Sequence, residues 1–181
     1  KLLYAKEKYD WVRTLLMCEP RGSNVMSVAI LTEPCTPGTD VGVLYMEVGG
    51  WMPMCGHDTI GVGTALVECG MVKVAEPYTE LKLDTAAGVV TLKIKVSGQK
   101  AETVSFVNAP AFMLRSQETG DTKEYGKVTV DIGYGGNFYA IVDVQAVGLD
   151  LKRENYRSLI DAGNLLKTYI NEQLPVVHPE K

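Results

Sequence analysis

Cys55, Gly56 and His57 follow one another in the chain, and an apolar run from Ile60 to Val72 comes directly after them. This order predicts a thiol at the first turn of a buried helix. The first-turn N–H groups of a helix have no intrahelical partner, and the helix dipole adds partial positive charge there. Both effects favour a thiolate, the reactive form of cysteine, and both favour an anionic ligand such as a carboxylate.

The alternative is a core cysteine beside a surface histidine, since free cysteine is among the most buried residue types. Composition alone leaves these two interpretations evenly matched. The pair Gly49-Gly50 and Pro53 upstream, together with a glycine at position 56 that would let a ligand approach the backbone, favour the functional one. Asp58 suits the start of a helix, yet its negative charge would oppose a thiolate at Cys55 unless the side chain points away.

A metal site and a cysteine hydrolase fit the same residues less well. Zinc takes three or four ligands, but the other histidine and the other cysteines are not at ligand spacing; these are His178, Cys18, Cys35 and Cys69. A hydrolase needs a histidine held over the sulfur, and His57 is too close in sequence to Cys55 to be placed there easily. We therefore expect no metal.

Composition excludes several broad classes of protein. The 181 residues are 46% hydrophobic and 22% charged, as in ordinary globular domains. A net charge of -4 without clusters of lysine and arginine argues against a nucleic-acid partner. No apolar run approaches the roughly 20 residues that span a bilayer, and the first residues do not resemble a signal peptide. The four cysteines show no CxxC pairing, so we expect free thiols in the cytoplasm.

The hydrophobic pattern predicts strands wrapped around one central helix. That helix carries almost no charge until Glu68, so we expect other elements to enclose it on all sides. Its glycines Gly61 and Gly63 would be explained by close approach of those strands. The predicted elements are a helix at 1–18, strands at 26–31 and 41–48, the central helix at 59–69, strands at 80–84, 90–96, 104–108, 128–132 and 138–144, and a helix at 154–173.

A polar stretch at residues 114–126 predicts a loop and the boundary between two domains, 1–120 and 121–181. One strand pair, one helix and a tail are too little to bury a second core, so the second domain looks cut short. The first helix opens at Lys1 without a capping residue, which predicts further chain upstream.

The segment Met54-Cys55-Gly56-His57, followed by Thr59-Ile60-Gly61, resembles the first catalytic motif of the proline racemase and hydroxyproline epimerase family. Three further stretches match in family order and extend the resemblance over nearly the whole chain: Glu19-Pro20-Arg21-Gly22, Val107-Asn108-Ala109-Pro110-Ala111-Phe112 and Tyr134-Gly135-Gly136-Asn137-Phe138-Tyr139-Ala140-Ile141-Val142. The resemblance implies the α+β diaminopimelate-epimerase-like fold. In that fold two pseudo-symmetric halves each wrap strands around a central helix; here the second half would be incomplete.

The resemblance also implies inversion at Cα without PLP or another cofactor. Two cysteines face opposite sides of a small amino-acid substrate: one thiolate removes the α-proton, and the other cysteine, as a thiol, delivers a proton to the opposite face. Carried over, Cys55 is one of these two groups, and Gly56 and His57 hold the substrate. The family also makes a homodimer an expectation.

The chain departs from the family pattern. The second motif, of the type Asp-Arg-Ser-Pro-Cys-Gly-Thr-Gly, is absent from these residues, so the chain holds one of two catalytic cysteines. Asp58 replaces the more usual glycine or asparagine, Ser23 stands where histidine is common, and neither Asn137 nor His178 has an assigned role.

Ser27 bears on the substrate. In the absence of the resemblance it is an ordinary packed hydroxyl, but its position carries phenylalanine in many proline racemases and serine in hydroxyproline epimerases. A ring hydroxyl needs a hydrogen-bond partner, so we expect 4-hydroxyproline, with proline as the next substrate. Dehydration of 3-hydroxyproline is disfavoured because Cys55 is usually replaced there. A different class of function, a silent module that binds small carboxylates, remains open.

Overall fold

The computed structural model describes residues 1–180 and divides the chain into two compact units, Lys1–Pro110 and Ala111–Lys181. The division lies ten residues before the boundary predicted after residue 120. The loop predicted at 114–126 is wrong: most of it lies in the strand β7, Phe112–Thr122. Its polar side chains are mainly exposed while its backbone pairs with β8, so the stretch is a strand without an apolar signature.

The remaining elements are as follows. Helices are α1 (Leu2–Lys8), α2 (Asp10–Met17), α3 (Gly56–Glu68) and α4 (Tyr156–Gln173), with short 3-10 turns at Val144–Val147 and Arg153–Asn155. Strands are β1 (Ser27–Thr32), β2 (Val41–Glu47), β3 (Gly50–Met52), β4 (Tyr78–Thr85), β5 (Gly88–Ser97), β6 (Lys100–Val107), β8 (Gly126–Tyr134) and β9 (Phe138–Val142).

The first unit is a mixed sheet in the order β1-β2-β4-β5-β6, with β3 paired to β2. The β2–β4 pair is parallel and the other pairs are antiparallel. Helix α3 contacts both edge strands, β1 and β6, and also β5. A flat sheet cannot reach one helix with both of its edges, so the sheet curls around α3. The predicted α+β arrangement of strands around a central helix is therefore confirmed for this unit.

The prediction that α3 is enclosed on all sides is wrong. Ile60 is 44% exposed, and Gly61 and Ala65 on the same face are also exposed. The curled sheet covers only part of the circumference of the helix, which leaves this apolar face outside the core. On the covered side the packing is tight: a Cβ at Gly63 would lie 2.7 Å from the Cδ2 of Leu92. Close approach of the sheet thus requires glycine at position 63 but not at position 61.

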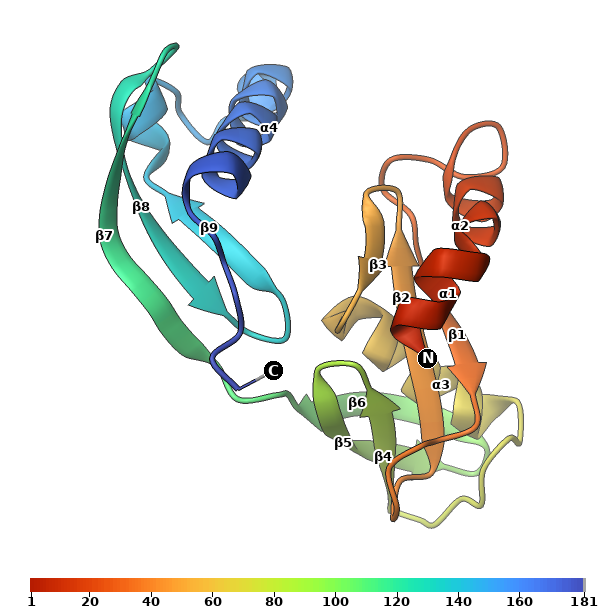
Figure 1. Ribbon diagram of the computed structural model, residues 1–181. Coiled ribbons are helices and arrows are strands. Elements are labelled where there is room, and N and C mark those ends of the chain that lie inside the picture. The colour runs from red at the N-terminus through yellow and green to blue at the C-terminus, as the bar shows by residue number, and fades with distance from the viewer. Residues whose placement is uncertain (181) are drawn as a thin grey trace. The chain divides into compact units, whose positions relative to one another are not determined.

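Helices α1 and α2 pack on the other face of the β1–β2–β3 layer, so that in Figure 1 they lie on the near side of these strands and α3 on the far side. A single helix was predicted over residues 1–18; the structure breaks it at Tyr9, whose backbone is not helical. Asp10 begins α2, and its Oδ1 accepts hydrogen bonds from Trp51 Nε1 (2.8 Å) and Arg13 Nε (2.7 Å). This carboxylate ties α2 to β3, the strand that leads to Cys55.

These contacts make the attachment of α2 sensitive to acid. The hydrogen bonds from Arg13 and Trp51 lower the pKa of Asp10 from 3.8 to about 2. A group with a depressed pKa stabilises the fold above its unfolded pKa, and this contribution is lost as the pH falls through the folded value. We expect tryptophan fluorescence to change between about pH 4 and pH 2, and Asp10→Asn to abolish that step. A step of equal size in the variant would contradict the assignment.

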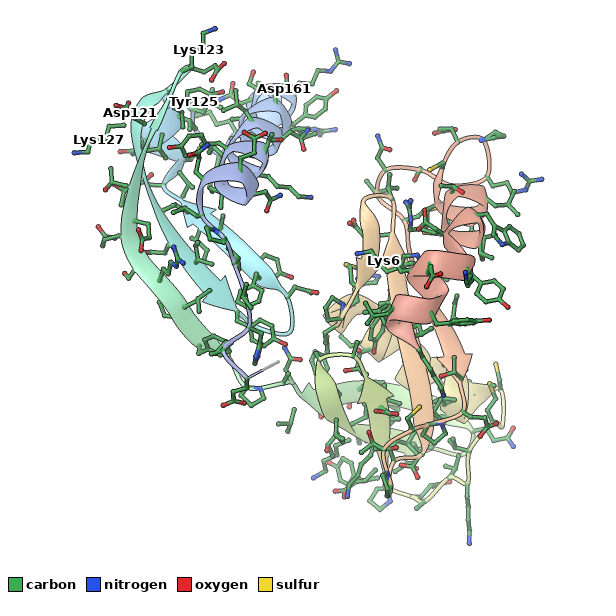
Figure 2. All side chains as sticks on the ribbon, viewed as in Figure 1. Lys6, Asp121, Lys123, Tyr125, Lys127 and Asp161 are labelled. Atoms are coloured by element: carbon green, nitrogen blue, oxygen red, sulfur yellow. The ribbon has the colours of Figure 1, made fainter. Side chains whose placement is uncertain are left out.

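The second unit is a three-stranded antiparallel sheet, β7-β8-β9, with α4 packed on it. We expected too few elements here for a separate core, but β7 supplies a third strand and a small core forms. Its buried members are Val128, Val130, Ile132, Leu166 and Ile170. Tyr125 packs against this cluster, whereas Lys123 and Lys127 on either side of it are exposed (Figure 2).

Candidate active site

Cys55 is the N-cap residue of α3, with an extended backbone (φ −137°, ψ 115°). The helix begins at Gly56, three residues before the predicted start at Thr59. The half-buried thiol therefore lies beside the first-turn N–H groups that have no partner inside the helix. The prediction that the cysteine stands at the amino end of the central helix is confirmed.

A buried pair of hydroxyl groups holds this end of α3 against the sheet. The Oγ1 of Thr59 donates to the carbonyl oxygen of Cys55 at 2.7 Å, and lies 2.7 Å from the hydroxyl of Tyr45 on β2. Both side chains are fully buried. Burial raises the pKa of Tyr45 to about 12, so its hydroxyl stays protonated and can donate to Thr59. The backbone of Cys55 is thereby fixed from the core of the unit.

Thr59→Val should therefore destabilise the first unit. It leaves the buried Tyr45 hydroxyl without its partner, which costs about 1–3 kcal/mol. Both tryptophans, Trp11 and Trp51, lie in this unit, so their fluorescence during urea unfolding reports its stability. Thr64→Val is the matched control, because Thr64 makes the same bond to the carbonyl four residues earlier on an exposed part of α3. A change in the control as large as that in Thr59→Val would contradict the argument.

The electrostatic environment of Cys55 differs from the expectation of a favoured thiolate. Burial raises the pKa of the thiol above its ordinary value. The N–H groups of Asp58 and His57 act in the opposite direction, as expected at a helix start, while the carboxylate of Asp58 adds to the rise. The helix end does assist the thiolate, but desolvation and a neighbouring negative charge outweigh it, so Cys55 is a thiol at neutral pH.

Ser27 and Asp58 are joined across the interface of β1 and α3. The Oγ of Ser27 donates to Oδ1 of Asp58 at 2.7 Å. Asp58 is 9% exposed, and its Oδ2 has no hydrogen-bond partner anywhere in residues 1–180. The hydrogen of Ser27 is thus already committed, and only the lone pairs of its oxygen remain free to accept from a ligand.

Gly56 and His57 complete the predicted set. A Cβ at position 56 would lie 3.2 Å from Phe106 Cζ, so the ring of Phe106, not open space, faces this glycine. Gly56 can therefore contribute to ligand binding only through its backbone N–H. The side chain of His57 is exposed and lines a groove of about 610 Å³ beside α3. That groove is mostly apolar and is also lined by Asp58, Ala29, Leu31, Ile60, Gly61, Val62 and Ala65, but not by Cys55 or Ser27.

Two residues without an assigned role lie in the second unit. His178 packs edge-on against Tyr134, Phe112 and Phe138, with ring centroids 4.8–6.2 Å away. Its Nδ1 accepts from the N–H of Glu180 at 3.1 Å. His178 is thus a packing residue in this unit. The side chain of Asn137 donates to the Tyr139 hydroxyl at 3.4 Å.

All four cysteines are free thiols, as predicted. Within residues 1–180 no three His, Cys, Asp or Glu side chains gather in a way that could hold a metal ion. Over the same residues, the helices are too short or too polar to cross a bilayer.

Sequence reasoning missed two couplings at the site, Tyr45–Thr59 and Ser27–Asp58. Thr59 carried a usable signal, since it is a polar residue in an apolar helix and lies one turn after Cys55. Asp58 was recognised as ambiguous, but its partner lies 31 residues away and is fixed only by the packing of β1 on α3.

A family model described as proline racemase matches residues 1–181. A 4-hydroxyproline 2-epimerase of Streptosporangium roseum is 50% identical over 94% of this chain and 51% of its own length. An uncharacterized protein of Bacillus anthracis is 54% identical over 99% of this chain and 52% of its own length. The chain thus spans about half the length of these relatives.

The fold has a close match among solved structures. A hydroxyproline epimerase from Agrobacterium vitis, solved with trans-4-hydroxy-L-proline bound, aligns with a TM-score of 0.91 at 33% identity, covering 98% of this chain and 53% of that one. The curled mixed sheet with α3 on its concave side is therefore the architecture of one part of that enzyme.

Proposed function

This chain belongs to the proline racemase family, and we propose that it carries one of the two cysteines of an epimerase that inverts Cα of 4-hydroxyproline without a cofactor. The observation that carries the proposal is the position of Cys55, in the Met-Cys-Gly-His motif at the amino end of α3. A half-buried thiol there can exchange a proton with a carbon acid, and the helix N–H groups can hold a carboxylate and the charge that develops beside it.

In this proposal the reaction needs a second acid–base group on the opposite face of Cα. One group takes the α-proton as a thiolate and the other returns a proton as a thiol. Gly56 and His57 would contribute the N–H groups that bind the substrate carboxylate. The second cysteine is not among these 181 residues, so the activity proposed is that of the whole protein. A cytoplasmic setting, which four free thiols favour, is part of the same proposal. A homodimer is also part of it.

The choice of 4-hydroxyproline rests on Ser27. Its Oγ donates to Asp58 and keeps lone pairs that can accept a hydrogen bond from a ring hydroxyl. The bare ring of proline offers no such donor, which makes proline the second candidate. The identity with a 4-hydroxyproline 2-epimerase supports the same order.

A silent module that binds a small carboxylate is the rival from another class, because this chain holds only one catalytic motif. Incubation of the whole protein with each diastereomer of 4-hydroxyproline in heavy water separates the two. Deuterium at Cα together with the other diastereomer supports the epimerase. Protection of Cys55 from alkylation by the ligand, without deuterium exchange, would overturn it in favour of the module.

A further inference from the structure

Asp58 is a buried carboxylate with one oxygen, Oδ2, that neither the fold nor the proposed chemistry uses. It is nine-tenths buried, yet only one of its oxygens is hydrogen-bonded, to Ser27. Oδ2 is shielded from solvent and has no partner in residues 1–180. A buried oxygen without a hydrogen-bond partner is destabilising, and more so when it is charged, so a nearby donor is expected.

A candidate donor at the same end of α3 is the thiol of Cys55. Cys55 caps the helix on whose first turn Asp58 lies, and the negative charge of the Asp58 carboxylate raises the pKa of the thiol. A thiol is a weak donor that can turn about its Cβ–Sγ bond to meet such an acceptor. Ser27 on β1 takes Oδ1 of Asp58, and Oδ2 is left for the thiol of Cys55, which would complete a series of three residues from β1 to the helix end.

Two other titratable residues in the described part of the chain lie near Cys55. They are His57 on α3, whose side chain is exposed, and Tyr45 on β2, which stays neutral. Strand β1 brings no titratable side chain to α3. Where β5 and β6 pack on the helix, Lys95 and Glu102 pair with each other at 2.8 Å on the surface.

We propose that Asp58 is a positioning residue for Cys55: its free Oδ2 accepts the thiol hydrogen and holds Cys55 in the protonated form, so that Cys55 begins the reaction as the proton donor. This rests on the proposed function and deepens it. The thiolate on the opposite face takes the α-proton; Cys55 then breaks its S–H bond, a C–H bond forms on its own face of Cα, and Cys55 is left as the thiolate. The free enzyme therefore starts in the state that accepts one diastereomer.

The test is the pH dependence of alkylation of Cys55 by iodoacetamide, followed by mass spectrometry of the Cys55 peptide. Asp58→Asn removes the charge and should move the profile to lower pH, with alkylation near pH 7 about three- to tenfold faster. Asp58→Glu should restore behaviour close to that of the unsubstituted protein. Glu80→Gln removes the same charge from an exposed position on β4 and should change nothing. Coincident profiles for Asp58→Asn and the unsubstituted protein would overturn the proposal.

Two further measurements guard against misfolding. Cys18 is half-buried, so unchanged labelling of Cys18 shows that Asp58→Asn keeps its fold. Ser27→Ala keeps the carboxylate but removes the hydrogen bond to Oδ1, which leaves more of its negative charge facing the thiol, so Cys55 alkylation should slow. Faster alkylation in Ser27→Ala would count against the series. Neither experiment requires turnover, so failure of the epimerase proposal and failure of this one are separable.

Discussion

Replacing Cys55 by serine should lower kcat/KM for inversion at Cα by about 10³-fold or more, because general acid–base catalysis by one positioned group contributes about 10²–10⁴-fold. A serine hydroxyl is far too weakly acidic to deliver the proton, and far too hard to ionise to remove one. The measurement is the rate of interconversion of the two 4-hydroxyproline diastereomers by the whole protein, followed by chiral chromatography.

The substitution is informative because it should not harm the fold. Position 55 is the N-cap of α3, and serine is among the residues most favoured there, since its oxygen can accept from a first-turn N–H. The fixed carbonyl of Cys55 and its bond from Thr59 do not involve the side chain that changes. A loss of activity in a protein that unfolds like the original therefore reports chemistry.

Cys69→Ser is the matched control. Cys69 is exposed and caps the other end of the same helix, so the same exchange of sulfur for oxygen should leave turnover within about twofold. Near-normal turnover in Cys55→Ser would remove Cys55 from the mechanism. Equal losses in both variants would show that the effect is not specific to Cys55, and would likewise contradict the assignment.

Residue patterns were sufficient to predict a helix or strand where apolar residues recur at regular spacing along one face of the element. The central helix, the alternating strand β5 and the helix α4 follow from such patterns. Strand β7 does not, because its side chains are polar and its pairing with β8 shifts register near Arg115. Gln117 has a positive φ of 56° at this irregularity. An irregular polar strand has the composition of a loop. Only its pairing with β8 distinguishes this segment from a loop.

At the site, sequence reasoning located Cys55, its helix end and Asp58, but it did not predict which of their opposing effects on the pKa of the Cys55 thiol is larger. Helix-terminal N–H groups beside Cys55 could be predicted, and they do lower the pKa of its thiol. The larger opposing effect is burial, to which Phe106 on β6 and Tyr45 on β2 contribute by packing near this end of the helix. The orientation of Asp58 toward Ser27 depends in turn on strand β1, so neither effect is visible in a local window.

Ser27→Ala should reduce kcat/KM for 4-hydroxyproline by about 10–100-fold while changing that for proline by less than about threefold. The ring hydroxyl of 4-hydroxyproline loses its hydrogen-bond acceptor in the variant. A buried hydroxyl without a partner destabilises the complex with 4-hydroxyproline, whereas the complex with proline contains no such hydroxyl. Part of the effect through Asp58 is common to both substrates, so the ratio of the two kcat/KM values is the quantity to compare.

Ser105→Ala provides the reference for this ratio, because Ser105 is an exposed serine on β6 that bonds a backbone carbonyl. Its ratio should equal that of the unsubstituted protein. If Ser27→Ala lowers kcat/KM equally for 4-hydroxyproline and for proline, Ser27 acts only through Asp58 on the thiol of Cys55. A contact between Ser27 and the ring hydroxyl is then excluded. If kcat/KM for 4-hydroxyproline falls relative to that for proline, the hydroxyl at position 27 serves both the substrate and the carboxylate. Its hydrogen is directed to Asp58, and its lone pairs accept from the ring hydroxyl.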